Sequence, residues 1–138
     1  MCKEFLGGNM DNIREYFLNY LNGYNQTWVD KDLEKLKEYY DTDNNRLIYY
    51  DNHKNNDTYT LKEHLELVSD FLVNGKETES GQVEELIIED FNVFLKNDTA
   101  CLCFIAKYKS CPRPYVRTTM YIEKIEDNWK VLHVHCSF

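Results

Sequence analysis

Long apolar runs, clusters of basic residues and a signal peptide are all missing from this sequence of 138 residues. Nowhere do about 18 apolar residues run together, and Met1 to Asn9 contain no apolar signal core, so we expect a cytoplasmic protein without membrane contact. The formal net charge is −8 and no Lys/Arg cluster is present. Because such a chain repels phosphate backbones, no nucleic-acid partner is expected.

Paired cysteine motifs and glycine-rich phosphate loops are missing as well. The five cysteines form no C-x-x-C pair, which is typical of free thiols in a reducing compartment, so no disulfide is expected. The sequence contains neither a cysteine nucleophile signature nor a phosphate loop, and we expect no cofactor.

What is present is ordinary for a folded domain. Apolar residues make up 43% and charged residues 29% of the chain, and no linker, internal repeat or low-complexity tract interrupts it. A single domain is therefore predicted over residues 1–138.

The first half of the chain shows the periodicity of helices. From about Met10 to Trp28, apolar residues recur at the spacing of an amphipathic helix about five turns long. A second, shorter helix is predicted from Lys31 to Tyr40, with Asp30 or Asp32 able to cap its first turn.

A short β segment and a third helix are predicted next. Residues 46–51 are β-branched and aromatic enough for a strand, and a short strand is predicted to return at 58–59. Thr60 and Glu63 form a capping box that opens the third helix, which Gly75 ends.

The second half, from Gln82 to Phe138, reads as a meander of four antiparallel strands on which the helices must lie. A bulge is predicted near Glu89 and Asp90, because the first strand is long. The strands are predicted at residues 83–96, 99–109, 115–125 and 129–137, joined by turns at 97–98, 110–114 and 126–128.

Three helices cover only one face of such a sheet. The other face is too apolar to be left in water without a partner, so we expect a homodimer packed sheet to sheet. Its residues are predicted to be Cys101, Cys103, Ile105, Thr119, Tyr121, Val131, His133 and His135.

The order of elements, together with three stretches, resembles the NTF2-like superfamily and its SnoaL-like group. The stretches are Asn97 to Ile105, Trp129 to Ser137, and the pattern Trp28-x-x-x-Asp32-x-x-x-Leu36. The chain is also similar to the association domain of calcium/calmodulin-dependent protein kinase II. The resemblance implies an α+β fold, a cone in which three N-terminal helices pack on a curved, mostly antiparallel sheet.

The resemblance also implies a conical pocket between the sheet and the first helix. Enzymes of the superfamily place an acid/base residue and a Tyr or His there, whereas other members bind a ligand or only assemble. In the kinase association domains a histidine and strand arginines hold carboxylates in the pocket. His64 resembles that histidine, but the arginine positions fall on Ala106, Met120 and Cys136, so the resemblance implies a largely apolar pocket here.

Three residues are candidates for catalysis. His64, with an ordinary pKa of about 6.5, is a candidate general base, and the alternative is a satisfied histidine between helix and sheet. Tyr20 would donate to a ligand carbonyl, and the alternative is a core residue. Asp51 would act as a carboxylate base if buried, and the alternative is a solvated turn residue. The predicted ligand-binding residues are Tyr16, Tyr20, Trp28, Tyr49, His64, Phe104, Met120 and Cys136.

His133-x-His135 and Cys101-x-Cys103 each place two metal-binding side chains at alternate strand positions, and therefore on one face. The strand predicted to begin at Tyr115 separates the pairs by about 10 Å, whereas zinc lies about 2.0–2.3 Å from its ligands. No metal site is therefore predicted.

The sequence thus predicts a dimeric protein that binds a small, mostly apolar molecule in its cone. One alternative is a cofactor-free isomerase, dehydratase or hydrolase that uses His64 with Tyr20 or Asp51, and another is a pure oligomerisation module. A deep pocket with a shifted His64 pKa would favour the enzyme.

The opposite arrangement would favour the module: a pocket filled by the side chains of Tyr16, Trp28 and Phe104 leaves no room for a ligand.

Overall fold

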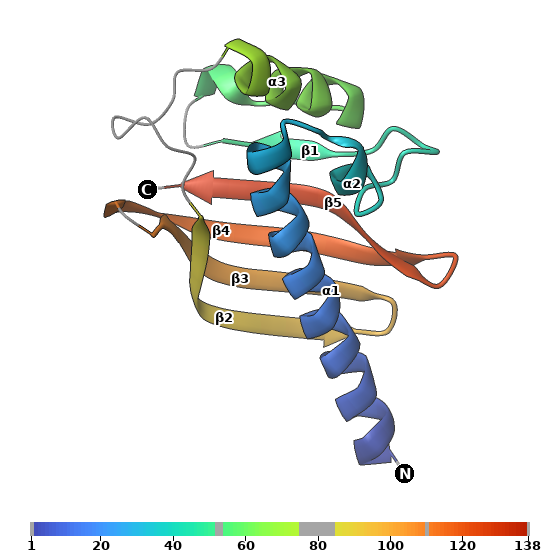
Figure 1. Cartoon of the computed structure of the whole chain (residues 1–138). Helices are drawn as coiled ribbons and strands as arrows, with labels where there is room; N and C mark the ends of the chain where they lie inside the picture. The colour runs from blue at the N-terminus through green and yellow to red at the C-terminus, as the bar shows by residue number, and fades with distance from the viewer. Residues whose placement is uncertain (1, 52–53, 75–84, 110, 138) are drawn as a thin grey trace.

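The longest helix, α1 (Cys2–Asp30), crosses one face of a sheet in the computed structural model, which describes residues 2–51, 54–74, 85–109 and 111–137 (Figure 1). Ile13, Phe17 and Tyr20 are buried against the sheet at helical spacing. The predicted start near Met10 was wrong, because the apolar period marks only the part of α1 that contacts the sheet. The N-terminal turns extend past the sheet edge (Figure 1).

The chain leaves α1 through Lys31, whose φ of 57° is incompatible with a continuing helix. The Asp32 carboxylate accepts a hydrogen bond of 3.0 Å from the Glu34 amide, as predicted for a capping residue. The helix that follows, α2 (Glu34–Lys37), is much shorter than the predicted span 31–40. The reason is that the backbone at Tyr39 turns to the sheet, where its carbonyl accepts a hydrogen bond of 2.9 Å from the Val131 amide.

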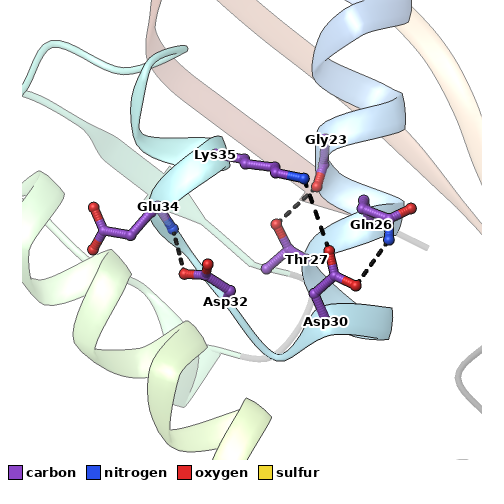
Figure 2. Close-up of polar contacts among 7 residues, drawn as sticks. All are labelled: Gly23, Gln26, Thr27, Asp30, Asp32, Glu34 and Lys35. Carbon is purple, nitrogen blue, oxygen red and sulfur yellow. Dashed lines mark hydrogen bonds and ion pairs between the residues drawn. The ribbon is translucent and has the colours of Figure 1, made fainter.

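Side-chain bonds hold the last turns of α1 (Figure 2). The Thr27 hydroxyl donates to the Gly23 carbonyl at 2.7 Å, and the Gln26 amide donates to the Asp30 carboxylate at 2.9 Å. Gly23 also allows the Tyr39 ring to pack close to α1, because a Cβ at this position would lie 3.2 Å from that ring. The end of α1 is thereby fixed against the segment that follows α2.

A short strand, β1 (Ile48–Tyr50), occupies the middle of the predicted span 46–51. The single bridge between Tyr49 and Thr58 is the predicted return, and the 3-10 helix η1 (Lys54–Asn56) lies between them. Helix α3 (Leu61–Asn74) then begins at the predicted capping box. The Thr60 hydroxyl accepts from the Glu63 amide at 3.2 Å, as predicted. The Glu63 carboxylate accepts from the Tyr59 amide at 2.8 Å, one residue before the amide that the predicted box would use.

Removing this cap should weaken the fold measurably. Thr60→Ala is expected to lower the free energy of unfolding by about 1 kcal/mol, because the Glu63 amide loses its acceptor. Urea denaturation followed by circular dichroism measures the change. Thr60→Ser keeps the hydroxyl and should stay close to wild type, whereas an equal loss in both variants would show that the hydroxyl is not the cause.

The predicted meander is confirmed: β2 (Leu86–Lys96), β3 (Thr99–Tyr108), β4 (Cys111–Ile125) and β5 (Asn128–Ser137) pair antiparallel in succession. β1 joins parallel to β5, so the sheet order is β1-β5-β4-β3-β2. Figure 1 shows α1 in front of this sheet and α3 above its β1 edge. The predicted connection 75–81 and the predicted strand start at Val83 lie outside the described residues.

Bulges shape the strands. The register shifts between Glu89 and Asn92, and Asp90 has a φ of 53°, which confirms the predicted bulge. The predicted turn at 110–114 was wrong, since β4 already begins at Cys111. In the pairing of β3 with β4, a register shift separates the Tyr108–Cys111 pair from the Ala106–Val116 pair. Pro112 and Pro114 lie in this irregular stretch of β4, where a residue without a backbone N–H is tolerated.

The prediction that Val131 lies on the outer face of the sheet was wrong, because β5 contains a further bulge at Leu132. Tyr121 pairs with His133 and Ile122 with Val131, which leaves Leu132 as an extra residue in β5. Because side chains alternate along a strand, the extra residue reverses which face they occupy. Val131 is therefore 0% exposed in the core rather than on the outer face.

The core lies between α1 and the sheet. Its buried residues are Ile13, Phe17, Tyr20, Leu36, Tyr40, Leu47, Leu61, Ala100, Leu102, Phe104, Ala106, Met120, Ile122, Trp129, Val131, Val134 and Cys136.

Among the described residues, no helix is long and apolar enough to cross a membrane.

Candidate functional site

A cavity of about 490 Å³, here called the cone cavity, lies between α1, α3 and the inner face of the sheet. Its wall is mostly aromatic and aliphatic. Among its lining residues are Phe17, Tyr20, Tyr24, Trp28, Tyr49, Asp51, Asn56, His64, Phe104, Ala106, Lys107, Thr118, Met120, Val134 and Cys136. This volume falls within the range of small-molecule sites in proteins.

The structure brings all the proposed catalytic residues to this cavity, along with all but one of the predicted ligand-binding residues. Ala106, Met120 and Cys136, which the resemblance to the kinase association domains singled out, also line it. The roles of the candidate residues stay predictions, and the placement of these three gives the cavity an apolar floor.

Tyr16 is the residue that the structure places elsewhere. Its hydroxyl donates a hydrogen bond of 2.9 Å to the Tyr39 carbonyl, and the two rings meet edge to face at 5.6 Å. The side chain joins α1 to the segment after α2 instead of lining the cavity. Helical spacing put Tyr16 beside Tyr20, but a residue four positions earlier lies on a neighbouring part of the helix surface.

His64 reaches the cavity from the first turns of α3 and is only 7% exposed. Its ring stacks on Tyr49 at 4.6 Å and meets Tyr40 edge to face at 5.9 Å. Its Nδ1 is buried and has no hydrogen-bond partner among the described residues. Because a buried polar atom without a partner is costly, this nitrogen is the strongest candidate for contact with a ligand.

Burial also sets the charge of His64. It lowers the pKa of the imidazole to about 4, and the nearby Asp51 carboxylate acts weakly in the opposite direction. The ring is therefore neutral at pH 7, so one nitrogen donates and the other accepts.

Asp51 follows β1 at the border of the cavity and is half-buried. The Asn56 amide donates a hydrogen bond of 3.1 Å to its carboxylate, and its own backbone amide donates to Asp57 at 2.8 Å. These bonds fold the loop after β1 back on itself. Asp51 is thus held near His64 by local turn contacts.

Two tyrosine hydroxyls of the cavity, those of Tyr20 and Tyr49, have described partners. Tyr20 and Tyr40 share a hydrogen bond of 3.1 Å, and burial raises the pKa of Tyr20 well above its ordinary value. The Tyr49 hydroxyl lies 3.5 Å from Cys136 Sγ, and burial raises the pKa of that thiol. These groups are neutral at pH 7, and Cys136 is not an activated nucleophile.

Sequence reasoning missed several lining residues. Thr118 alternates with Met120 on β4, so strand parity placed it on the inner face. Its hydroxyl lies 3.9 Å from Cys136 Sγ. Tyr24 lies one helical turn beyond Tyr20 and had the same signal. No sequence signal marked Asn56 as a lining residue, because the position of its amide depends on the turn after β1.

Formal charge is sparse in the cone cavity. Lys107 lines it near the β2 edge, but its ammonium forms an ion pair with Glu89. Asp51 is the carboxylate among the lining residues. Within the described part of the chain, no group of three His, Cys, Asp or Glu side chains is placed to bind a metal ion. The arrangement favours an uncharged, mostly apolar occupant with a hydrogen-bonding group.

No protein-family model matches the sequence, and no curated protein matches it. Solved structures do match. An NTF2-like protein of unknown function from Pseudomonas putida is 14% identical with a TM-score of 0.71, covering 95% of this chain and 87% of its own. A second, from Shewanella oneidensis, is 22% identical with a TM-score of 0.67, covering 91% and 98%.

A third similar structure, from Streptomyces avermitilis, is described as a candidate dehydratase of the NTF2-like family. It is 17% identical with a TM-score of 0.67, and the match covers 92% of this chain and 96% of that one. Identities this low show the fold and leave the activity open. The predicted cone of helices on a curved, mostly antiparallel sheet is confirmed, and the chain has the NTF2-like fold.

Proposed function

We propose that the protein binds a small, uncharged, mostly apolar molecule in the cone cavity, with a polar atom of the ligand on His64 Nδ1. The observation that supports this most is the buried Nδ1 without a described partner in a cavity of about 490 Å³. A ligand hydroxyl, amine or carbonyl would satisfy the nitrogen, while the rings of Tyr20, Trp28 and Phe104 would cover the apolar part.

Charge argues for an uncharged ligand. An anion would meet Asp51 and would lack a free cation, since Lys107 is paired with Glu89. His64 itself is neutral at pH 7 because burial lowers its pKa to about 4. An ion that left water for this aromatic wall would therefore lose hydration without gaining a matching partner.

The dye N-phenyl-1-naphthylamine tests this proposal, because it is uncharged, apolar and carries one N–H donor. His64→Ala is expected to weaken its binding about fivefold to tenfold, the value of one lost hydrogen bond. Fluorescence titration at pH 7 measures the dissociation constant.

His64→Phe keeps a ring against Tyr49 but removes the nitrogens, so it should weaken binding to a similar extent. Glu66→Ala, an exposed change on the same helix, should leave binding unchanged. Equal affinity of wild type and both His64 variants would contradict a role for His64.

A second candidate is a cofactor-free acid/base enzyme of the isomerase, dehydratase or hydrolase type. The shifted His64 pKa, with Asp51 nearby, favours it over a pure oligomerisation module, as does a cavity that side chains have not filled. A neutral imidazole at pH 7 is able to accept a proton from a bound ligand.

Proton abstraction next to a carbonyl is the step that isomerases and many dehydratases share. Incubating apolar β-hydroxy ketones and unsaturated ketones with the protein in D₂O, and following deuterium incorporation by NMR, tests for it. Exchange that His64→Ala abolishes would support the enzyme. Dye binding that depends on His64 without any exchange would leave the binding protein as the better account.

A further inference from the structure

The outer face of the sheet, turned away from α1, carries two thiols and two imidazoles in adjacent rows. Strand pairing fixes these rows, because each residue lies directly beside its partners on the neighbouring strands. The first row is Cys101 on β3, Tyr121 on β4 and His133 on β5, and the second is Cys103, Thr119 and His135.

The thiols are placed as a chelating pair. Cys101 and Cys103 are both free and half-buried. Both lie on β3 two positions apart, so their side chains leave the same face of the sheet. Two thiolates that approach from one strand are ligands that soft and borderline cations such as zinc prefer.

His133 is oriented as metal-binding histidines usually are. His133 Nδ1 lies 2.8 Å from the Ile48 carbonyl, so the tautomer with a proton on Nδ1 donates to it and leaves Nε2 with a free lone pair. The Tyr50 ring meets His133 edge to face at 5.3 Å and His135 at 5.9 Å. Such support holds a ring in one orientation before a metal binds.

A single chain cannot bring the two pairs together. β4 lies between β3 and β5, which separates the thiols from the imidazoles by about 10 Å. Each pair alone supplies two of the four ligands that zinc takes in a structural site. The site is incomplete without a second chain.

The outer face fits a second copy of the chain. Its two central rows contain no carboxylate, although the chain has a net charge of −8. Apolar side chains continue the first row at both edges, with Phe94 on β2 68% exposed and Ile48 on β1 41% exposed. Removal of this surface from water would favour association, and acidic repulsion between the copies would be small at its centre.

Symmetry then matches the two halves of the site. A two-fold axis that runs along β4, in the plane between two facing sheets, places β3 of each copy opposite β5 of the other. Phe94 of each copy would face Ile48 of the other. Facing sheets pack about 10 Å apart, a gap that a cysteine and a longer histidine side chain span when both bind one ion.

We propose that two copies pack face to face along β4 and bind two zinc ions, each through Cys101 and Cys103 of one copy and His133 and His135 of the other. Each site has the two-sulfur, two-nitrogen tetrahedral set of structural zinc centres.

Metal binding and light scattering test the proposal on the whole protein. With Zn²⁺, the wild type is expected to be a dimer that binds one ion per chain. With Co²⁺ it should give the absorption of tetrahedral cobalt bound to thiolate. Cys101→Ser/Cys103→Ser and His133→Asn/His135→Asn should each lose that absorption while keeping the wild-type circular dichroism. A wild type that is monomeric in Zn²⁺, or a double variant that keeps the spectrum, would overturn the proposal.

Mixing the two double variants distinguishes a shared site from a site within one chain. A mixed dimer contains one intact site, made from the thiols of one chain and the imidazoles of the other. Joint refolding should therefore restore about one quarter of the wild-type cobalt absorption per chain, because half of the dimers are mixed and each has one of two sites. Absence of recovery in a sample that light scattering shows to be dimeric would refute the shared site.

Discussion

Replacing Leu102 with alanine is expected to lower the free energy of unfolding by about 3 kcal/mol, the middle of the range for a buried leucine. Leu102 lies on β3, is 0% exposed and belongs to the core between the sheet and α1. Its neighbours cannot collapse fully into the space that the side chain leaves, because they are fixed by strand pairing on both sides. Urea denaturation at pH 7 measures the change.

Leu18→Ala is the matched control, since Leu18 lies on α1 and is 57% exposed. The same chemical change there should alter stability by no more than about 0.5 kcal/mol. Equal losses in the two variants would mean that α1 does not lie with its Ile13 and Phe17 stripe against the sheet, and would contradict the fold described above.

Acid should destabilise the protein through His64. Its pKa is about 4 in the folded chain and about 6.5 when unfolded, so between these values the unfolded chain binds more protons. Stability is therefore expected to fall as the pH drops from about 6.5 towards 4. The difference in pKa corresponds to about 3 kcal/mol at most.

The comparison with His64→Gln isolates this contribution, because acidic groups titrate in the same window in both proteins. Denaturant midpoints at intervals from pH 7.5 to pH 4.5 should fall more steeply in the wild type than in the variant. Parallel curves would show that His64 is not held neutral by burial, and the cone cavity would then be wetter than the structure indicates.

The sheet was predictable from sequence because its signals are local. A run of residues that is apolar on both faces marked β3, and Asn97 and Asp127 fell at turns where the backbone adopts positive φ. The helix-capping residues Thr60 and Glu63 were found for the same reason. Each of these features depends on a few adjacent residues.

The errors came from features that depend on distant contacts. Val131 was assigned to the outer face because one extra residue at Leu132 reverses the alternation, and nothing in the sequence marks that bulge. The predicted second helix ran to Tyr40, but pairing with Val131 ends it at Lys37. In both cases the position of β5 overrode the local preference.

Some residues of the candidate site were predictable from the sequence, and others were not. His64 on α3 and Met120 on β4 were predicted at the cavity by the resemblance to NTF2-like domains, and both residues line it. Tyr16 was predicted there by helical spacing, but it bonds to the Tyr39 carbonyl. The lack of a partner at His64 Nδ1 follows from packing, which no sequence pattern reveals.

A crystal structure of the protein with N-phenyl-1-naphthylamine tests the central claim most directly. The account predicts dye density between α1 and the inner face of the sheet, with its nitrogen within about 3 Å of His64 Nδ1. Dye bound only on the outer face, or a cone cavity closed by the side chains of Tyr20, Trp28 and Phe104, would contradict it.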